Sequence, residues 1–507
     1  MKRKSIWIIA VTAVCLLLIG LAAGFFIRPA IIESNNVPPP LKIIGDVEEL
    51  QTINSLDELA EIERIENKGV VLKAIKLEKL IKISRPFSDS NKILFVSDDG
   101  VAAMVNETDI EKSFITYSAK NGWEAVNLNH PISSNVKNIS EIVISSMNNS
   151  WNYGLNIIKP DKNLLNITPG QMYLKAYNVY NLEASPSMEN DNKTFRTDVY
   201  RMKKEMTVAD LLISSDSISN DSITDDSRIL VMGQNGEFKY LENDGYFEMK
   251  DNYINYWYSN GKNSIEKVAG VMLDPPTASI MDSCDDALHF IGKDEKVMLI
   301  LVDGFGFQQY LEATESGFAP FLASAKRADP AVSVYKPVTN TGLAAMITGK
   351  TPAESGIYSR KQRDLKVESI FGKIMSMGKT ALLVEGDIQI IKTEIEPMLN
   401  ADYNKDGMID DEIFKSALQN LQEVYDFLMV HFHSVDDSGH DFGDMSEKTM
   451  EAILQIDDYI SQLAKNWHGK IIITADHGMH SVGIEGNHGD FRFEDLIVPY
   501  VLIEGGK

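Results

Sequence analysis

Three apolar runs in the C-terminal part of the chain end directly in acidic or histidine residues. They are Val297 to Val302 before Asp303, Phe427 to Phe432 before His433, and Ile471 to Thr474 shortly before Asp476 and His477. Short runs of this kind are typical of strands buried in a parallel sheet. Parallel strands present their carboxyl ends at one edge, so the side chains that follow these runs are expected to converge there.

Further segments fit the same α/β pattern. Thr380 to Val384 and Leu496 to Leu502 are apolar enough for two more strands, and Met445 to Leu463 has the apolar spacing of an amphipathic helix. Asp444 and Glu447 are placed to cap that helix. We therefore predict that residues 286–507 form an α/β sandwich, with helices on both faces of a mostly parallel central sheet.

Six residues near the predicted sheet edge have side chains that bind metal ions well. They are Asp303, Asp436, His440, Asp476, His477 and His488. Carboxylate oxygens combined with imidazole nitrogens, without a thiolate, suit zinc, manganese or iron. Six ligands are more than one ion needs, and two ions about 4 Å apart are a common device for in-line displacement at phosphorus. The sequence predicts two divalent ions, zinc with manganese as the alternative.

Two threonines stand at the start of a predicted helix in the same domain. Thr339 and Thr341 precede the apolar stretch from Leu343 to Ile347. The positive end of a helix stabilises an alkoxide or a bound phosphate. A hydroxyl is a weak nucleophile at neutral pH unless a metal ion coordinates it. The helix end alone favours neither threonine over the other.

Five motifs in this part of the chain occur in a fixed order. They are Val302-Asp303-Gly304, the segment from Thr339 to Gly356, Asp436-Asp-Ser-Gly-His440, Thr474-Ala-Asp476-His477-Gly478-Met479 and Asn487-His488-Gly489. With these motifs, residues 296–507 resemble the nucleotide pyrophosphatase/phosphodiesterase and phosphonoacetate hydrolase branch of the alkaline phosphatase superfamily. The resemblance implies an alkaline-phosphatase-like fold and hydrolysis of phosphate esters. It does not extend to the residues before 296.

The resemblance also implies roles for individual residues. It makes Thr339, rather than Thr341, the nucleophile. It implies one ion held by Asp303, Asp476, His477 and Thr339, and another held by Asp436, His440 and His488. Arg360 stands where the family often has a substrate-contacting asparagine, and Ser355 replaces a family histidine, which leaves the substrate open. Substrate contacts are predicted for Asn340, Arg360 and His433, whereas His431 is predicted to be structural.

These features predict an extracytoplasmic metal-dependent hydrolase of phosphodiester or pyrophosphate bonds. A phosphonate hydrolase or phosphomonoesterase of the same superfamily is the nearest alternative. A sulfatase is disfavoured because the segment from Thr339 to Gly342 lacks the Cys/Ser-x-Pro-x-Arg setting common in those enzymes. From another class, an envelope-binding module with a vestigial hydrolase fold is the alternative, and the complete set of ligands argues against it.

The N-terminus has the features of a membrane anchor. Three basic residues at positions 2–4 precede an apolar run of 22 residues from Ile6 to Ile27. At about 1.5 Å per residue, such a helix spans a hydrocarbon core of about 30 Å. We predict a single-pass anchor at residues 1–28 and a linker at 29–40, with the rest of the chain outside the cytoplasm. A cleaved signal peptide of a secreted protein is the alternative.

The charge of the chain limits its partners. With 49 Lys+Arg against 73 Asp+Glu, the formal net charge is −24, which disfavours binding to nucleic acid. The expected partners are a small phosphate ester and, through the N-terminal helix, the membrane. The oligomeric state is not predicted.

Residues 41–285 alternate short apolar runs with Asn, Gly and Asp turns, which predicts β-rich structure. Two motif pairs suggest a duplication into units 41–150 and 151–285, folded apart from the hydrolase domain. Lys92 to Gly100 parallels Arg228 to Gly236, and Ile115 to Gly122 parallels Ile254 to Gly261. Matches in one order at nearly one spacing indicate a repeat.

An acidic segment between two of the predicted elements follows part of a calcium-loop pattern. Asp402, Asn404, Asp406 and Asp410 stand at positions one, three, five and nine of such a loop, with Gly407 at position six. The twelfth position is not glutamate, so an acidic turn that caps the following helix is the alternative to a calcium site.

Overall fold

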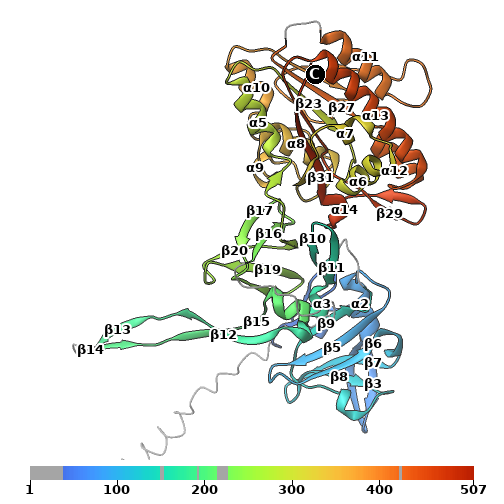
Figure 1. The fold of residues 1–507 in the computed structure, drawn as a ribbon. Helices are drawn as coiled ribbons and strands as arrows, with labels where there is room; N and C mark the ends of the chain where they lie inside the picture. The colour runs from blue at the N-terminus through green and yellow to red at the C-terminus, as the bar shows by residue number, and fades with distance from the viewer. Residues whose placement is uncertain (1–37, 149–152, 191–192, 214–226, 422–424, 507) are drawn as a thin grey trace, which may run out of the picture. The chain divides into compact units, whose positions relative to one another are not determined.

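The computed structural model describes residues 38–148, 153–190, 193–213, 227–421 and 425–506 (Figure 1). The chain divides into two compact units, Met1–Ile144 and Ser145–Lys507. Across these ranges, no helix is both long and apolar enough to cross a membrane. The predicted anchor at residues 1–28 and most of the predicted linker lie outside the described residues.

A mostly parallel eight-stranded sheet forms the centre of the C-terminal domain. The strand order is β22-β24-β31-β28-β23-β27-β25-β26. Only β31 runs against its neighbours β24 and β28. The strands are β22 (Ala278–Ser279), β23 (Val297–Val302), β24 (Asp329–Val332), β25 (Ala381–Glu385), β26 (Met398–Leu399), β27 (Phe427–Phe432), β28 (Lys470–Thr474) and β31 (Ile497–Glu504). The predicted α/β sandwich is confirmed.

Helices cover both faces of this sheet, as Figure 1 shows for α5, α8 and α10 on one side and α11, α12 and α13 on the other. The helices are α5 (Asp282–Ile291), α6 (Phe307–Ser316), α7 (Pro320–Ser324), α8 (Thr339–Thr348), α9 (Pro352–Ser355), α10 (Ile370–Ser376), α11 (Asp410–Asn420), α12 (Ser434–Phe442), α13 (Glu447–Asn466) and α14 (Phe493–Leu496). Every residue of β23 and of β27 is buried, which explains their unbroken apolar sequences. 

Helix α13 differs from its prediction at the first turn. Its N-cap is Ser446, whose hydroxyl accepts a hydrogen bond from the backbone N–H of Thr449 at 3.1 Å. Asp444 instead accepts a hydrogen bond from the Ser481 hydroxyl. The predicted cap was wrong because Ser446, two residues later, accepts a hydrogen bond from an N–H of the first turn while Asp444 bonds Ser481.

The first compact unit contains a five-stranded sheet and a four-stranded sheet, ordered β2-β1-β9-β5-β6 and β3-β4-β7-β8. Its elements are β1 (Leu41–Gly45), β2 (Gln51–Ile53), β3 (Glu63–Asn67), β4 (Val70–Lys76), α2 (Leu77–Ser84), β5 (Asn91–Ser97), β6 (Ala102–Asn106), β7 (Ser113–Ser118), β8 (Gly122–Asn127) and β9 (Ile139–Ser146), with short 3-10 turns η1 (Leu56–Glu58), η2 (Glu107–Asp109) and η3 (Ile132–Ser134). Apolar side chains from both sheets and α2 form its core.

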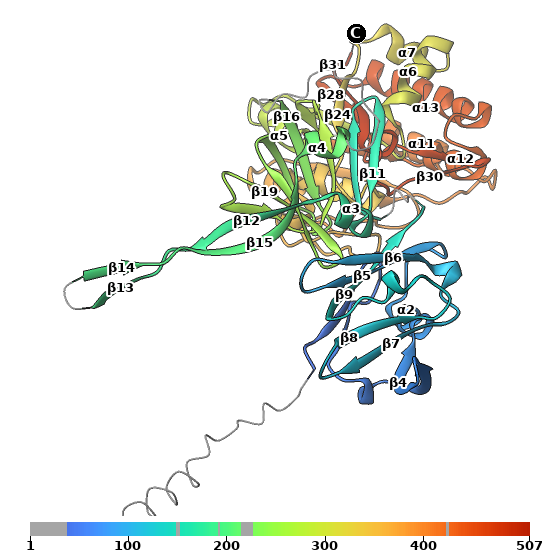
Figure 2. The same cartoon turned by 90° about the horizontal axis from the view of Figure 1, so that it is seen from below.

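The second β-rich region repeats this arrangement with additions. Its sheets are ordered β11-β10-β21-β16-β17 and β12-β15-β18-β19-β20. Its elements are β10 (Leu155–Lys159), β11 (Lys162–Ile167), α3 (Pro169–Lys175), β12 (Tyr177–Ala184), β13 (Ser187–Asn190), β14 (Lys193–Arg196), β15 (Val199–Met206), α4 (Val208–Ile213), β16 (Arg228–Gly233), β17 (Phe238–Glu242), β18 (Tyr246–Lys250), β19 (Tyr253–Tyr258), β20 (Asn263–Ile265) and β21 (Val268–Leu273). Figure 2 shows β12 and β15 continuing into the β13–β14 hairpin as a long arm.

The two β-rich regions share a strand order that supports the proposed duplication. In the first five-stranded sheet, β1 pairs antiparallel with β2 and parallel with β9. In the second, β10 pairs in the same way with β11 and β21. The first motif pair also occupies equivalent turns. Gly100 follows β5 with φ 84° and Gly236 follows β16 with φ 83°, and each donates its N–H at 3.0 Å to the residue three positions earlier. Glycine is the natural residue at this left-handed turn position.

The second motif pair does not occupy equivalent positions. By strand order, β15 of the second region corresponds to β4 of the first. Strand β7, which holds Ile115, pairs with the end of β4, whereas the strand that pairs with the end of β15 is β18. Ile254 lies one strand later, on β19. That match was wrong, because alternating hairpins ending in Asn-Gly look alike one strand out of step. The duplication itself stays a proposal, now supported by strand order and by the first motif pair.

The second β-rich region packs against the C-terminal domain within the same compact unit. Ile158, Leu230 and Met272 share a buried cluster with Phe491 and Ile497. At Gly270 on β21, an added Cβ would lie 2.2 Å from the Phe491 ring, so only glycine permits this contact. The predicted boundary at residue 285 therefore separates two parts that share a core. This packing favours folding of the two parts together over separate folding.

Candidate metal centre

The predicted metal-ligating side chains come from loops and a helix at one edge of the central sheet. Asp303 follows β23, and Asp476 and His477 follow the neighbouring strand β28. On the other side of β23, β27 leads into α12, where Asp436 and His440 stand four residues apart on one helical face. His488 follows the short strand β30 (Glu485–Asn487), which pairs with β29 (His480–Val482).

A glycine permits the close approach of two of these segments. Gly304 has φ 71°, and a Cβ added there would lie 2.8 Å from Oδ1 of Asp436 and 2.9 Å from its Cα. No other residue would fit without displacing Asp436. Gly304 also donates its N–H to Oδ1 of Asp476 at 3.3 Å. The Asp-Gly motif thus brings the carboxylates of three segments together.

The first cluster contains Asp303, Asp476 and His477, all buried. The Nε2 atom of His477 lies 3.3 Å from Oδ1 of Asp303 and 3.4 Å from Oδ2 of Asp476. The Oγ1 atom of Thr339, the first residue of α8, lies 3.5 Å from the same Nε2. The side chain of Thr341 is also buried, but its hydroxyl has no hydrogen-bond partner.

The second cluster contains Asp436, His440 and His488. Oδ2 of Asp436 lies 3.4 Å from Nε2 of His440, and Oδ1 lies 3.6 Å from Nε2 of His488. Arg360 directs its Nη2 at the same Nε2 of His488. His477 is close enough to both clusters to join them, since its ring stacks on that of His488 with centroids 3.7 Å apart.

The three imidazoles share one tautomer. In His440, His477 and His488, Nδ1 lies 2.9–3.1 Å from a backbone carbonyl oxygen, of Gly486, Gly478 and Pro337 respectively. A nitrogen facing a carbonyl must carry the proton, so Nε2 of each ring is left with a lone pair that faces the carboxylates. This arrangement is the one found in histidines that bind metal ions.

Three carboxylate oxygens at the centre have no hydrogen-bond partner although they are buried. They are Oδ1 of Asp303, Oδ1 of Asp436 and Oδ2 of Asp476. Burial, together with the charge of Asp303, raises the pKa of Asp436 and of Asp476 well above their usual values. Burial lowers the pKa of His477 to about 4 and that of His488 to about 2, so both rings are neutral at neutral pH. Repelling carboxylates and neutral imidazoles fit cations placed between them.

The distances between ligand atoms also fit metal coordination. Ligands about 2.0–2.2 Å from a tetrahedral ion lie about 3.3–3.6 Å from one another. The four separations given above for the two clusters span 3.3–3.6 Å. The donor set, the tautomers and these separations therefore fit divalent metal ions.

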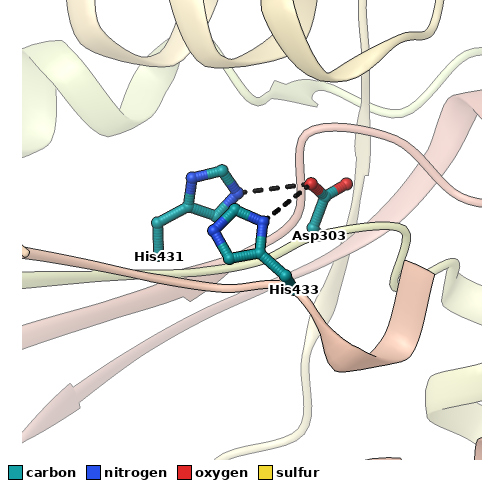
Figure 3. Close-up of side chains that lie close together, drawn as sticks. All are labelled: Asp303, His431 and His433. Carbon is teal, nitrogen blue, oxygen red and sulfur yellow. Dashed lines mark ion pairs between the residues drawn. The ribbon is translucent and has the colours of Figure 1, made fainter. Parts of the chain in front are cut away.

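Two further histidines lie beside Asp303, and sequence reasoning gave them other roles. His431 is fully buried at the end of β27, and His433 is the N-cap of α12. Figure 3 shows both rings directed at the carboxylate of Asp303. On their other sides, both rings contact Glu385, the last residue of β25. Sequence analysis missed Glu385, although an acidic residue directly after Thr380 to Val384 follows the same strand-end rule that found Asp303.

The three predicted substrate-contacting residues have different surroundings. Arg360 reaches the second cluster, as described above. Asn340 is buried, and its amide donates to the backbone carbonyls of Gln362 and Ile390 at 3.0 and 3.4 Å, which ties two loops to α8. His433 is engaged between Asp303 and Glu385. All three side chains thus have protein partners, and their contact with a substrate stays a prediction.

The acidic segment at residues 402–410 separates Asp410 from its other predicted ligands, of which Asn404 donates a hydrogen bond to Asp406 at 3.0 Å. Asp402, Asn404 and Asp406 accept hydrogen bonds from backbone N–H groups of their own loop. Asp410 is fully buried, and its two oxygens accept hydrogen bonds at 2.8 Å from the N–H groups of His433 and Ser434. The predicted calcium role of Asp410 was wrong, because its carboxylate caps α12, the helix that carries Asp436 and His440.

A model of one protein family matches the region that builds this centre. Residues 297–373 and 379–499 match the model described as type I phosphodiesterase/nucleotide pyrophosphatase. Residues 297–499 are thus similar to this family. The predicted resemblance to the phosphodiesterase/nucleotide pyrophosphatase family is thereby confirmed for these residues, and with it the prediction of an enzyme family.

Individual relatives match parts of the chain. GPI ethanolamine phosphate transferase 2 of Schizosaccharomyces pombe is 36% identical over 86 residues, which are 15% of this chain and 11% of that protein. Phosphonoacetate hydrolase from Sinorhizobium meliloti 1021 is 18% identical over 36% of this chain and 56% of its own, with a TM-score of 0.31. Murine ectonucleotide pyrophosphatase/phosphodiesterase 5 is 19% identical over 37% and 58%, with a TM-score of 0.31. The matches thus span about a tenth of the transferase and little more than half of each solved structure.

Proposed function

We propose that the chain is a metal-dependent hydrolase of phosphodiester or pyrophosphate bonds. Two divalent ions, zinc or manganese, would be held by Asp303, Asp476 and His477 and by Asp436, His440 and His488. The single observation that carries this proposal is that Nε2 of His440, His477 and His488, each left unprotonated by a carbonyl at Nδ1, lies beside carboxylates of which three buried oxygens have no hydrogen-bond partner. The bound ions would supply Lewis acidity toward the phosphoryl oxygens and lower the pKa of a coordinated hydroxyl.

In this proposal, Thr339 is the nucleophile. Its Oγ1 would form a bond to phosphorus while the bond from phosphorus to the leaving oxygen breaks, and water would then release the phosphoryl group from the threonine. The start of α8 stabilises negative charge on the attacking oxygen and on the phosphate. Gly342 brings this helix end to the centre, because a Cβ there would lie 2.5 Å from the carbonyl oxygen of Asp476. Arg360 would donate hydrogen bonds to a phosphate oxygen.

The location is part of the same proposal. The basic residues and the apolar run at residues 1–28 support an N-terminal anchor with the phosphodiesterase domain outside the cytoplasm. Secretion after cleavage of this segment remains the alternative. A small phosphate ester is the proposed partner.

A panel of chromogenic substrates tests the reaction class. With the metal-loaded chain, we expect bis-p-nitrophenyl phosphate to be hydrolysed faster than p-nitrophenyl phosphate and p-nitrophenyl phenylphosphonate by about tenfold or more, measured as kcat/KM. A chain stripped of metal by chelation serves as the blank. A clear preference for the monoester or the phosphonate would replace the proposed class with the corresponding alternative.

Transfer to an alcohol is a second candidate, which the match to the ethanolamine phosphate transferase favours. A phosphothreonine intermediate is open to attack by an alcohol as well as by water. With bis-p-nitrophenyl phosphate as the substrate, hydrolysis yields p-nitrophenyl phosphate. Added ethanolamine should then shift the product to the diester of ethanolamine and p-nitrophenyl phosphate, as measured by phosphorus NMR. An unchanged product ratio at high ethanolamine concentration would leave hydrolysis as the reaction.

A further inference from the structure

Asp303 has two sets of histidine neighbours, one on each carboxylate oxygen. Oδ1 faces His477 of the proposed catalytic centre at 3.3 Å. Oδ2 faces Nε2 of His431 at 3.3 Å and Nδ1 of His433 at 3.6 Å (Figure 3). One ligand atom from each of Asp303, His431 and His433 lies within 4.8 Å of the others. The catalytic proposal uses the first set and leaves the second unexplained.

Glu385 fixes the tautomers of this second set. Its carboxylate lies 3.0 Å from Nδ1 of His431 and 2.9 Å from Nε2 of His433. A further hydrogen bond of 2.9 Å from the N–H of Gly386 holds the carboxylate in place. A neutral ring donates its proton to such a carboxylate, so Nε2 of His431 and Nδ1 of His433 keep lone pairs that point at Asp303. Carboxylates in this position are typical partners of metal-binding histidines.

One nitrogen of the set, which faces Asp303, has no hydrogen-bond partner. Nε2 of His431 makes no hydrogen bond, and the whole residue is 0% exposed. A buried polar atom without a partner destabilises a fold by about 1–3 kcal/mol, which a bound cation would remove. The separations of 3.3 and 3.6 Å match the edges of a tetrahedron about a zinc ion, as in the two catalytic clusters.

We propose that Asp303, His431 and His433 hold a third divalent ion, with Glu385 as the residue that positions both rings. Two imidazoles and one carboxylate suit zinc better than magnesium or calcium. Asp303 would then bridge this ion and the ion of the first catalytic cluster through its two oxygens. The inference rests on the proposed function only through Asp303, because the catalytic proposal requires two ions and no third.

The competing arrangement contains no ion. Both rings would be protonated and would form ion pairs with Asp303 and Glu385, which neutralises the two buried carboxylates by itself. The two arrangements differ in the number of metal ions per chain and in the electron density between the rings. Both can be measured without an activity assay.

Metal counting and crystallography distinguish them. The full-length chain is equilibrated with buffered zinc, separated from free metal and analysed by mass spectrometry for metal content, and crystals are measured at the zinc absorption edge. We expect three ions per chain and an anomalous peak between His431, His433 and Asp303. Two ions and no peak at that place would overturn the proposal while leaving the catalytic pair intact, whereas fewer than two ions would contradict the proposed function itself.

Matched variants test the assignment. His433→Asn and Glu385→Gln should each lose one ion of three and the corresponding anomalous peak. His289→Asn is the control, because His289 lies exposed on α5 and contacts Lys293. It should retain all three ions. Retention of three ions by His433→Asn would overturn the assignment, and the wild-type peak decides the question if a variant fails to fold.

Discussion

Thr339→Ala should reduce phosphodiester hydrolysis by roughly 10⁴-fold or more, the loss that follows removal of a nucleophile. The reason lies in the position of its hydroxyl. Oγ1 is 3.5 Å from Nε2 of His477, within reach of an ion held by that histidine and the two aspartates of the first cluster. No protein ligand other than Oγ1 is lost, so metal content, measured by mass spectrometry, should stay within the wild-type range.

The neighbouring threonine supplies the control for this variant. The hydroxyl of Thr341 is buried without a hydrogen-bond partner, so Thr341→Val removes a polar group that contributes nothing to a network. The variant should keep most of the wild-type kcat and the same thermal unfolding temperature or a slightly higher one. If Thr341→Val lost hydrolysis while Thr339→Ala retained it, the assignment of the nucleophile would be wrong.

Asp436→Ala and His440→Ala should each lose metal and hydrolysis together. Asp436 faces both histidines of its cluster, at 3.4 and 3.6 Å, so its removal leaves the second ion with imidazole ligands only. We expect the loss of one ion per chain and a fall in kcat of at least about 10²-fold, the usual effect of removing one electrostatic stabiliser of the transition state. Metal content and the rate with a chromogenic diester check both parts.

A histidine outside the centre controls for nonspecific effects of the alanine substitution. His289 lies exposed on α5 and contacts only Lys293 among its polar neighbours in the described part of the chain. His289→Ala should keep the wild-type metal content and rate. The proposed ligand set would be contradicted if His440→Ala retained full metal content and full activity, because its Nε2 would then have no role in binding.

The parts of the centre that the sequence predicted are those that follow from strand ends. Asp303, Asp476 and His477 come directly or almost directly after buried strands, and a parallel sheet places such residues at one edge whatever the loops do. Glu385 obeys the same rule at the end of β25 but carries no motif that draws attention to it. His431 lies within a strand, which suggested a structural role. The sequence of that strand does not show that Asp303 and Glu385, from neighbouring strands, lie beside the His431 ring.

Contacts between distant segments account for what the sequence did not predict. Asp410 looked like a loop ligand, yet its carboxylate caps α12 through the N–H groups of His433 and Ser434. The role depends on packing between α11 and β27, which local spacing does not contain. In the β-rich region, similar hairpins allowed a match between Ile115 and Ile254 that is one strand out of step. Pairing partners, and not motif spacing, set that register.

The central claim is that hydrolysis requires ions in both catalytic clusters. Its most direct test is the return of phosphodiester hydrolysis when a metal-free chain is titrated with zinc, with bound metal counted in the same samples. We predict no hydrolysis in the metal-free chain and full activity only when at least two ions are bound per chain. Full activity in the metal-free chain, or at one bound ion or fewer, would contradict the account.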